Sequence, residues 1–533
     1  MSRSHVAVNR NQVLLGVLLA ISLASMDQMI VASSMPQIVR DLNGVAHMSW
    51  VFTAYMLAST ITVPIFGKLS DLYGRRGMYL IAIIIFLMGS VMAGAAQAMW
   101  QLVLFRWIQG VGGGAMMVCA VATIGDIIPP AERGRYQGYI AAAFGVSNIL
   151  GPILGGWISE YFSWRWIFYI NLPLGAITLG VLAFSLPRVA RVARRSIDYL
   201  GALLLMSSLL PFMLVLVGGG HLFAWVSIPV IGLTVISISA LVAFVWVERK
   251  VTEPIMAIGS FKNRTYLTAI IISFFTAMAM ASTMMMVPLF VQGVLNVSPS
   301  ESGMAMVPMM IGMVISSIVA GQITARTGRY KPALVMGTLT ACGAMLSMSH
   351  IGIDSTLTRV IVGMTGIGLG LGATFPIISM VVQSAFDRSK IGEVTAGVQL
   401  FRSLGSTIGS AMLGGLFNYK MAWFIDQWSH HPFIRQLHQS FPDLGVDHLN
   451  GDMIQGMLTF SRQMELTAMF QSLPPRSREW LMDEFPSFLV AVRQGLTSSV
   501  DGLFLIGSVL LLVAVIAAMS IPEISLRRGD EPR

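Results

Sequence analysis

Uninterrupted apolar runs of about twenty residues recur along this chain, and they restrict its fold more than any other feature. The first of them, residues 14–36, reads LLGVLLAISLASMDQMIVASSMP. Charged residues make up 11% of the 533 residues, which is roughly half the fraction found in soluble domains. Because backbone polar groups inside a bilayer must be bonded within the segment, such runs predict helices. The chain is therefore expected to be an all-α protein that crosses a membrane many times.

The spacing of these runs predicts fourteen transmembrane helices. Six spans are expected within residues 13–186, two within 199–247 and six within 265–521. Lys and Arg concentrate in the loops on one side, whereas the short loops on the other side hold only Arg40 and Arg165. This asymmetry predicts that both termini are cytoplasmic. It also accounts for the net charge of +9 without a nucleic-acid partner.

Two sequence patterns occur twice, at nearly the same spacing along the chain. GKLSDLYGRR (residues 67–76) is echoed by GQITARTGRY (residues 321–330), and Arg106 with Gly110 is echoed by Arg359 with Gly363. Internal repeats of this kind are typical of transporters. They predict two six-helix halves, residues 1–186 and 265–533, separated by two inserted helices and a linker in residues 187–264.

The repeated loop pattern has a physical explanation. A very short connection between antiparallel helices needs close approach and left-handed backbone, which Gly67 and Gly74 permit. Arg75 and Arg76 would hold the loop at the inner surface through lipid phosphates or through carboxylate partners. The candidate carboxylate partners are Asp71 and Asp126.

The predicted fifth span contains GVSNILGPILGGW (residues 145–157). Gly151 and Gly155 lie four residues apart and form a small-residue face for close helix packing, while Pro152 frees a backbone carbonyl and bends the helix.

Together these motifs resemble the major facilitator superfamily, and more narrowly its fourteen-helix drug:proton antiporters of the EmrB/QacA type. The resemblance rests on GKLSDLYGRRG, FRWIQGVGGGAM (residues 105–116), GVSNILGPILGGW and WRWIFYINLPLG (residues 164–175). It covers nearly the whole chain except residues 418–498. Ser147 stands where the family pattern usually has another glycine. The positions that fit the antiporter motif are Gly138, Gly151, Pro152, Gly155 and Gly156.

The resemblance implies a major facilitator fold and proton-driven export of lipophilic or cationic drugs across a bacterial plasma membrane by alternating access. Some members dock to a periplasmic adaptor protein and others work alone. A dedicated exporter of an endogenous metabolite, siderophore or lipid is the alternative. An enzyme or a receptor built on the same scaffold is a further alternative from a different class.

Asp27 lies deep within the first span, where a charged side chain costs about 2.5 to 3.5 kcal/mol on insertion scales. An acid persists there mainly where it faces a cavity or a partner. Burial favours the protonated form of a carboxyl, so Asp27 is the predicted proton-coupling residue, with Arg106 tuning the transfer. Two other interpretations stay open. Asp27 could pair permanently with Arg106 as a structural ion pair, or it could lie in outer-leaflet water.

Substrates are expected in a cavity between the halves, lined mainly by the first, fourth, ninth and twelfth spans. The cavity residues proposed from the sequence are Gln28, Gln109, Met284 and Arg359. Met284 belongs to a methionine-rich region whose flexible thioethers suit dissimilar lipophilic ligands. The tenth span carries no acid, which favours monovalent or neutral substrates over divalent ones. Arg402 is interpreted as structural.

Other chemistries have no support in the sequence. There is no phosphate-binding GxxxxGK[ST] loop, HExxH pair or GxSxG elbow, so an ion gradient is the expected energy source and no enzyme activity is predicted. Cys119 and Cys342 both lie in apolar runs and indicate neither a disulfide framework nor a metal site. No cofactor is expected. Residues 418–498, which include an amphipathic stretch at 452–470, are expected to form an outer cap or a partner-docking surface.

Overall fold

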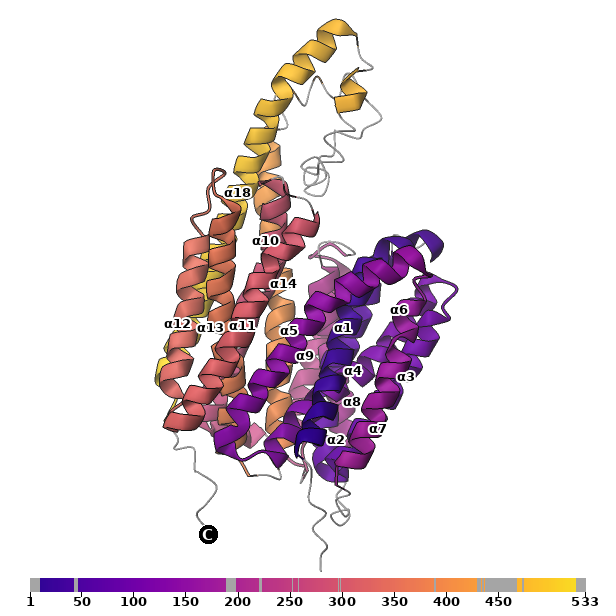
Figure 1. Ribbon diagram of the computed structural model, residues 1–533, viewed down its shortest axis with the longest axis vertical. Coiled ribbons are helices and arrows are strands. Elements are labelled where there is room, and N and C mark those ends of the chain that lie inside the picture. Colours follow the sequence, from indigo (N-terminus) through magenta and orange to yellow (C-terminus); the bar gives the residue numbers. More distant parts are fainter. Residues whose placement is uncertain are drawn as a thin grey trace, which may run out of the picture.

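The computed structural model describes most of the chain. The described residues are 10–42, 47–187, 198–219, 223–251, 253–256, 258–295, 297, 299–387, 390–428, 433, 436, 467–471 and 474–523. Within them the protein is built of helices, as the apolar runs predict, and Figure 1 shows these helices aligned roughly along one direction. Within residues 418–498, most of the amphipathic stretch 452–470 lies outside the described residues. The same holds for the four histidines of that segment, His430, His431, His438 and His448.

The first bundle contains seven helices from the N-terminal part of the chain. The sixth predicted span is divided here into a short helix and a longer one. The helices are α1 (Arg10–Leu42), α2 (Met48–Tyr73), α3 (Arg75–Gly94), α4 (Met99–Ile127), α5 (Pro130–Tyr161), α6 (Trp166–Tyr169) and α7 (Asn171–Ser185).

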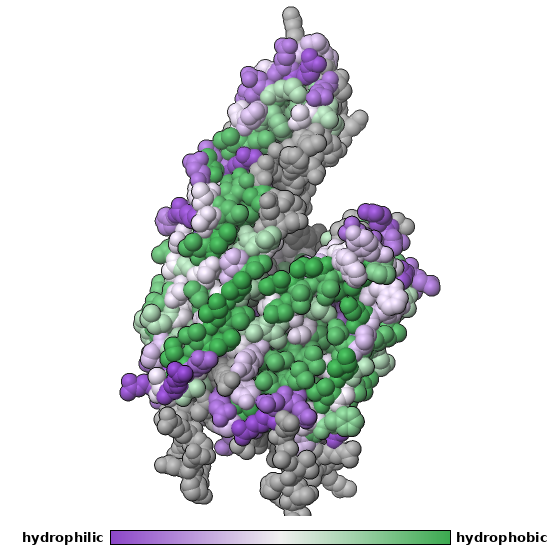
Figure 2. Space-filling view, in the orientation of Figure 1, coloured by the Kyte–Doolittle hydropathy of each residue, from purple (hydrophilic) through white to green (hydrophobic). Residues whose placement is uncertain are grey.

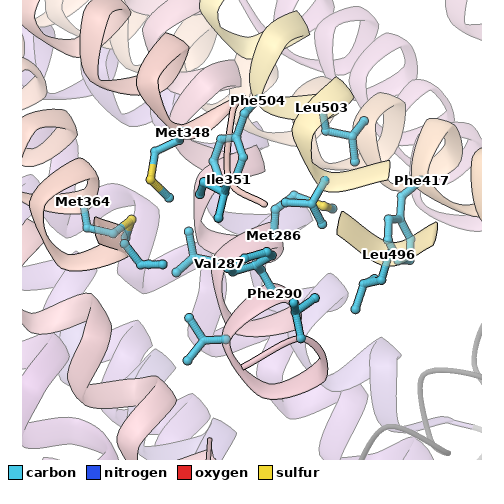
Figure 3. Close-up of a cluster of buried hydrophobic side chains, with 14 of the residues drawn as sticks. Met286, Val287, Phe290, Met348, Ile351, Met364, Phe417, Leu496, Leu503 and Phe504 are labelled. Atoms are coloured by element: carbon cyan, nitrogen blue, oxygen red, sulfur yellow. The ribbon is translucent and has the colours of Figure 1, made fainter. Parts of the chain in front are cut away.

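The second bundle is formed by the C-terminal part of the chain and is drawn on the left of Figure 1. Its helices are α10 (Arg264–Gly293), α11 (Pro299–Thr327), α12 (Lys331–Met348), α13 (Leu357–Ala385), α14 (Ile391–Trp428) and α18 (Pro475–Ser520). Buried apolar side chains from α10, α12, α13, α14 and α18 meet in its core (Figure 3), among them Met286, Phe290 and Phe504. Met286 thus belongs to the core of this bundle.

Two helices, α8 (Tyr199–Gly218) and α9 (Ile228–Glu248), lie between the bundles in sequence. Leu205 and Leu209 of α8 and Phe244 of α9 pack with Ile61 of α2 and Leu400 of α14. Because α2 and α14 belong to different bundles, the inserted pair covers one side of the seam between them. A short 3-10 helix, η2 (Ile258–Lys262), leads into α10.

Twelve helices in the described part of the chain are long and apolar enough to cross a membrane. The helices α12 and α14 pack against them within the second bundle, which makes the predicted number of fourteen plausible. Figure 2 shows apolar side chains covering the middle of the molecule and hydrophilic ones concentrated toward its two ends. Such an apolar belt is the surface expected of a protein solvated by lipid.

The two bundles touch closely at one end of the molecule, where the α2–α3 loop and the first turn of α14 meet. We call this end the motif end. Figure 1 shows the two bundles converging there, at the bottom of the view, and diverging toward the opposite end. A Cβ atom on Gly67 of α2 would overlap Ala396 of α14, so glycine permits this approach. Gly138 of α5 likewise lies against Ile318 of α11.

Candidate functional site

The α2–α3 loop at the motif end has the backbone that its glycine predicts. Gly74 has a φ of 87°, and its counterpart in the repeat, Gly328, has a φ of 68°. These values lie in the region that side chains disfavour, so both short connections depend on glycine. The repeated sequence therefore corresponds to a positive φ at the same position of both loops.

Arg75 and Asp71 form the centre of an ion-pair network at this loop. Arg75, the first residue of α3, pairs with Asp71 in the last turn of α2, and its Nε atom lies 2.6 Å from Asp126 Oδ2 of α4. Both carboxylate partners considered from the sequence are thus engaged together. Arg76 lies half-buried beside them, and its Nε has no hydrogen-bond partner.

Asp71 also bonds across the seam to the second bundle. Its two carboxylate oxygens accept hydrogen bonds from the backbone N–H groups of Gly392 (3.1 Å) and Glu393 (2.9 Å). The first N–H groups of a helix have no partner within the helix, and the helix dipole attracts negative charge there. Asp71 therefore caps α14 from the opposite bundle and holds the motif end closed.

Further contacts support this closure. Lys68 of α2 lies 2.9 Å from Glu253 of the linker and 3.9 Å from Glu393 of α14. Gln383 of α13 donates to the backbone carbonyl of Val121 on α4 at 3.2 Å. The loop motif thus belongs to an interface between the bundles, which its sequence alone does not reveal.

The antiporter motif of α5 packs against α1. A Cβ atom on Gly151 would overlap Met29, and one on Gly155 would overlap Ser33 and the carbonyl of Ile30. Gly156 has open space beside it, and Pro152 is exposed on the same helix. Two of the motif glycines therefore set the distance between α1 and α5, as the small-residue pattern predicts.

Asp27 is completely buried in the first bundle and pairs with Arg106 of α4. Its Oδ1 atom accepts hydrogen bonds from Gln109 Nε2 and Asn171 Nδ2, both at 2.8 Å. Gln109 and Asn171 also donate to Ser90 Oγ, at 3.2 and 2.9 Å. The interpretation that placed Asp27 in outer-leaflet water is wrong, because Asp27 is completely buried and three polar side chains bond to its carboxylate.

Both oxygens of the Asp27 carboxylate have polar partners. Oδ1 receives hydrogen bonds from two neutral amides, and the guanidinium of Arg106 lies against Oδ2. Asn171 and Ser90 were not identified from the sequence, although Asn171 lies within the quoted WRWIFYINLPLG stretch as a polar residue among apolar ones.

A cavity of about 330 Å³ lies between the two bundles, next to this cluster. Gln28, which follows Asp27, and Tyr55, whose ring centroid is 4.3 Å from Arg106 Cζ, both line it. Its lining comes from α1, α2, α4, α5, α10, α11, α13 and α14, so the expectation of four main lining helices is too narrow. The cavity is mostly apolar, as small-molecule sites are.

Two of the four cavity residues proposed from the sequence lie in its wall, and two do not. Gln28 and Met284 line the cavity. Gln109 instead belongs to the buried cluster around Asp27. Arg359 is exposed in the first turn of α13, which lies far along that helix from the lining residues Phe375 and Ser379. Its assignment to the cavity is therefore wrong.

Comparison with known proteins places the chain in a family. The profile of the Major Facilitator Superfamily matches residues 17–410. The chain belongs to this superfamily. Its fold and family are those of a multi-pass membrane transporter, and the resemblance to this superfamily drawn from the motifs is confirmed.

The chain is similar to two Bacillus subtilis (strain 168) proteins over most of its length. It is 34% identical to multidrug transporter protein MdtP over 527 residues, which cover 99% of this chain and 95% of that protein. It is 37% identical to multidrug resistance protein 3 over 402 residues, which cover 75% of this chain and 78% of that protein. A crystal structure of the human organic anion transporter MFSD10 matches this structure with a TM-score of 0.60 at 15% sequence identity. The match covers 94% of this chain and 99% of that chain. That last likeness concerns the fold alone.

Proposed function

We propose that this protein is a proton-coupled antiporter of a bacterial plasma membrane that exports lipophilic compounds by alternating access. The two bundles would rock about the cavity between them. The two Bacillus proteins to which the chain is similar are named as multidrug proteins, which supports varied lipophilic substrates. A mostly apolar cavity containing the methionine side chains Met280, Met284 and Met313 supports the same conclusion.

The observation that carries the proposal is the buried Asp27–Arg106 pair beside the cavity. Tyr55 contacts the guanidinium of Arg106 and lines the cavity, so substrate and ion pair share a neighbour. Movement of Tyr55 would let Arg106 withdraw from Asp27, and the carboxylate, left buried without its counter-ion, would then take up a proton. Return of Arg106 would expel that proton. On this proposal, the ion-paired form and the protonated form of Asp27 would be two states of the transport cycle.

The closed motif end agrees with one step of this cycle. If that end is cytoplasmic, as the basic residues predict, the protein is closed toward the cytoplasm, with Asp71 bonded across the seam. Export would then require release of this contact so that substrate can enter from inside. Asp71 and Arg75 would therefore control which side of the membrane reaches the cavity.

Gradient-driven export tests the proposal. The full chain is reconstituted into proteoliposomes, and the movement of a neutral lipophilic fluorophore is followed with an imposed pH gradient and after the gradient is dissipated by a protonophore. Export that requires the gradient supports the proposal. Export at the same rate after dissipation would contradict it. A carrier dedicated to one endogenous compound is distinguished by screening several unrelated fluorophores, of which only one would then be moved.

A further inference from the structure

Among the described residues that line the cavity, one has a strongly basic side chain, Arg402 of α14. It lies eleven residues after the first residue of α14, Ile391, which corresponds to about 16 Å along the helix. Half of a bilayer's hydrocarbon thickness is about 15 Å. If α14 enters the bilayer at its first residue, Arg402 would lie near the middle of the membrane, and it faces the cavity in which we propose that substrate binds.

Arg402 has no anionic partner among the described residues. None of their ion pairs involves it, and its buried Nε has no hydrogen-bond partner. Its guanidinium lies over the Phe375 ring, with Cζ 4.5 Å from the centroid. Arg106, by contrast, has Asp27 and Gln109 as partners. Arg106 and Arg402 are thus in opposite situations.

The rest of the wall does not neutralise Arg402. The described cavity lining contains neither Asp nor Glu, and its polar members are amides, hydroxyls and one phenol. These are Gln28, Tyr55, Ser59, Thr60, Gln137, Ser379, Gln399, Ser403 and Ser406. An unpaired cation at the centre of a membrane protein is costly, and such residues mark ligand or ion pathways. An anion that entered the cavity would supply the missing counter-charge.

We propose that Arg402 binds the acidic group of the substrate, so that the exporter prefers amphipathic anions, such as carboxylates or sulfonates on a lipophilic body, over cations. This inference rests on the proposed transport function and names its substrate class. A guanidinium binds a carboxylate through two parallel hydrogen bonds. The apolar side chains Met280, Met284 and Phe144, which line the same cavity, suit the lipophilic part of such a molecule. A cationic drug would meet a like charge and no carboxylate.

The test compares three probes with one lipophilic body, namely a dansyl group on a six-carbon chain that ends in a carboxylate, a carboxamide or an amine. Binding to the purified full-length protein in nanodiscs is measured by energy transfer from tryptophan to dansyl. Because one charge-assisted hydrogen bond contributes roughly tenfold or more in affinity, we expect the carboxylate to bind at least about tenfold tighter than the amine.

Variants test whether Arg402 causes the preference for the carboxylate probe. Arg402→Gln is expected to abolish the preference for the carboxylate and to leave binding of the neutral carboxamide within about twofold, which also reports that the cavity is folded. Arg402→Lys should retain a reduced preference, because it keeps the charge and loses the two-pronged geometry. Arg359→Gln is the matched control, since it removes an exposed arginine of α13 that is distant from the cavity.

The outcomes separate this inference from the proposed function. Equal or tighter binding of the amine by the unmodified protein, or an unchanged carboxylate preference in Arg402→Gln, would overturn the inference. Gradient-driven export of the carboxamide without any charge preference would overturn the inference alone. If none of the three probes is exported in response to the gradient, the proposed function itself fails.

Discussion

Replacing Asp71 with asparagine should open the motif end of the molecule. In the structure the two Asp71 oxygens accept hydrogen bonds from Gly392 N (3.1 Å) and Glu393 N (2.9 Å) at the start of α14. Asparagine keeps the shape of the side chain but offers one acceptor, so that one of these N–H groups loses its partner. It also removes the charge that interacts with the α14 dipole and with Arg75.

The magnitude of this effect follows from the groups that are lost. A hydrogen bond to a charged group contributes about 1.5–3 kcal/mol, and a charge at a helix N-terminus contributes about 0.3–1 kcal/mol. We therefore expect Asp71→Asn to disfavour the closed state by about 2–3 kcal/mol, since the Asp71 side chain is only 5% exposed and little screened. This is a change of roughly 30- to 150-fold in the equilibrium between the closed and open motif end.

The assay measures the distance between the bundles. Spin labels are attached through Tyr73→Cys on α2 and Arg326→Cys on α11, two exposed positions at the motif end, after replacement of Cys119 and Cys342 by alanine. Pulsed electron resonance should show a new population at longer distance in Asp71→Asn. Asp126→Asn is the control, because Asp126 pairs with Arg75 inside the first bundle. An unchanged distribution in Asp71→Asn, or an equal shift in Asp126→Asn, would refute the reasoning.

Three further predictions concern packing, charge burial and energetics. Gly155→Ala should lower the melting temperature of the purified protein, because its Cβ would overlap Ser33 and Ile30 at a cost of about 1–3 kcal/mol. Gly156→Ala, which has open space around it, should leave the melting temperature unchanged. Equal melting temperatures of the two variants would contradict the assigned contact between α1 and α5. Arg106→Gln should destabilise the protein by about 3–5 kcal/mol, because it leaves the buried Asp27 carboxylate unpaired. Adding Asp27→Asn should restore much of this stability, which chemical unfolding of the single and double variants measures. Absence of this rescue would contradict the ion pair between Asp27 and Arg106. If one proton enters for each anion exported, two positive charges move inward per cycle. A membrane potential that is negative inside, set by potassium and valinomycin, should therefore accelerate export of the dansyl carboxylate more than export of its neutral carboxamide. Equal acceleration of the two probes would contradict that stoichiometry.

The sequence predicts the helical segments well, because every apolar span in lipid must form its backbone hydrogen bonds within the segment, as a helix does. Apolar length alone locates α8 and α9, and the repeated glycines predict the left-handed backbone at Gly74 and Gly328. The packing face of Gly151 and Gly155 is also readable, since it depends on spacing within one helix. These are all local properties of the chain.

Properties that depend on distant segments could not be predicted in the same way. The sequence identifies Asp71 as a partner of Arg75 but not as a cap of α14, because that role requires a helix more than three hundred residues away. Arg359 and Arg402 look alike as basic residues in apolar runs. Only packing separates them, since Arg359 falls in the exposed first turn of α13 whereas Arg402 faces the cavity between the bundles. The pattern of residue types carries no information about which face of a helix meets that cavity.

The coupling role of Asp27 is the central claim, and proton movement driven by substrate tests it most directly. Proteoliposomes that contain a pH-sensitive dye receive a gradient of the exported probe and no pH gradient, with the unmodified protein or with Asp27→Asn. We predict that the unmodified protein moves protons against the flow of substrate, and that Asp27→Asn, which remains uncharged, exchanges substrate across the membrane without moving protons. Proton movement by Asp27→Asn at the rate of the unmodified protein would contradict the account.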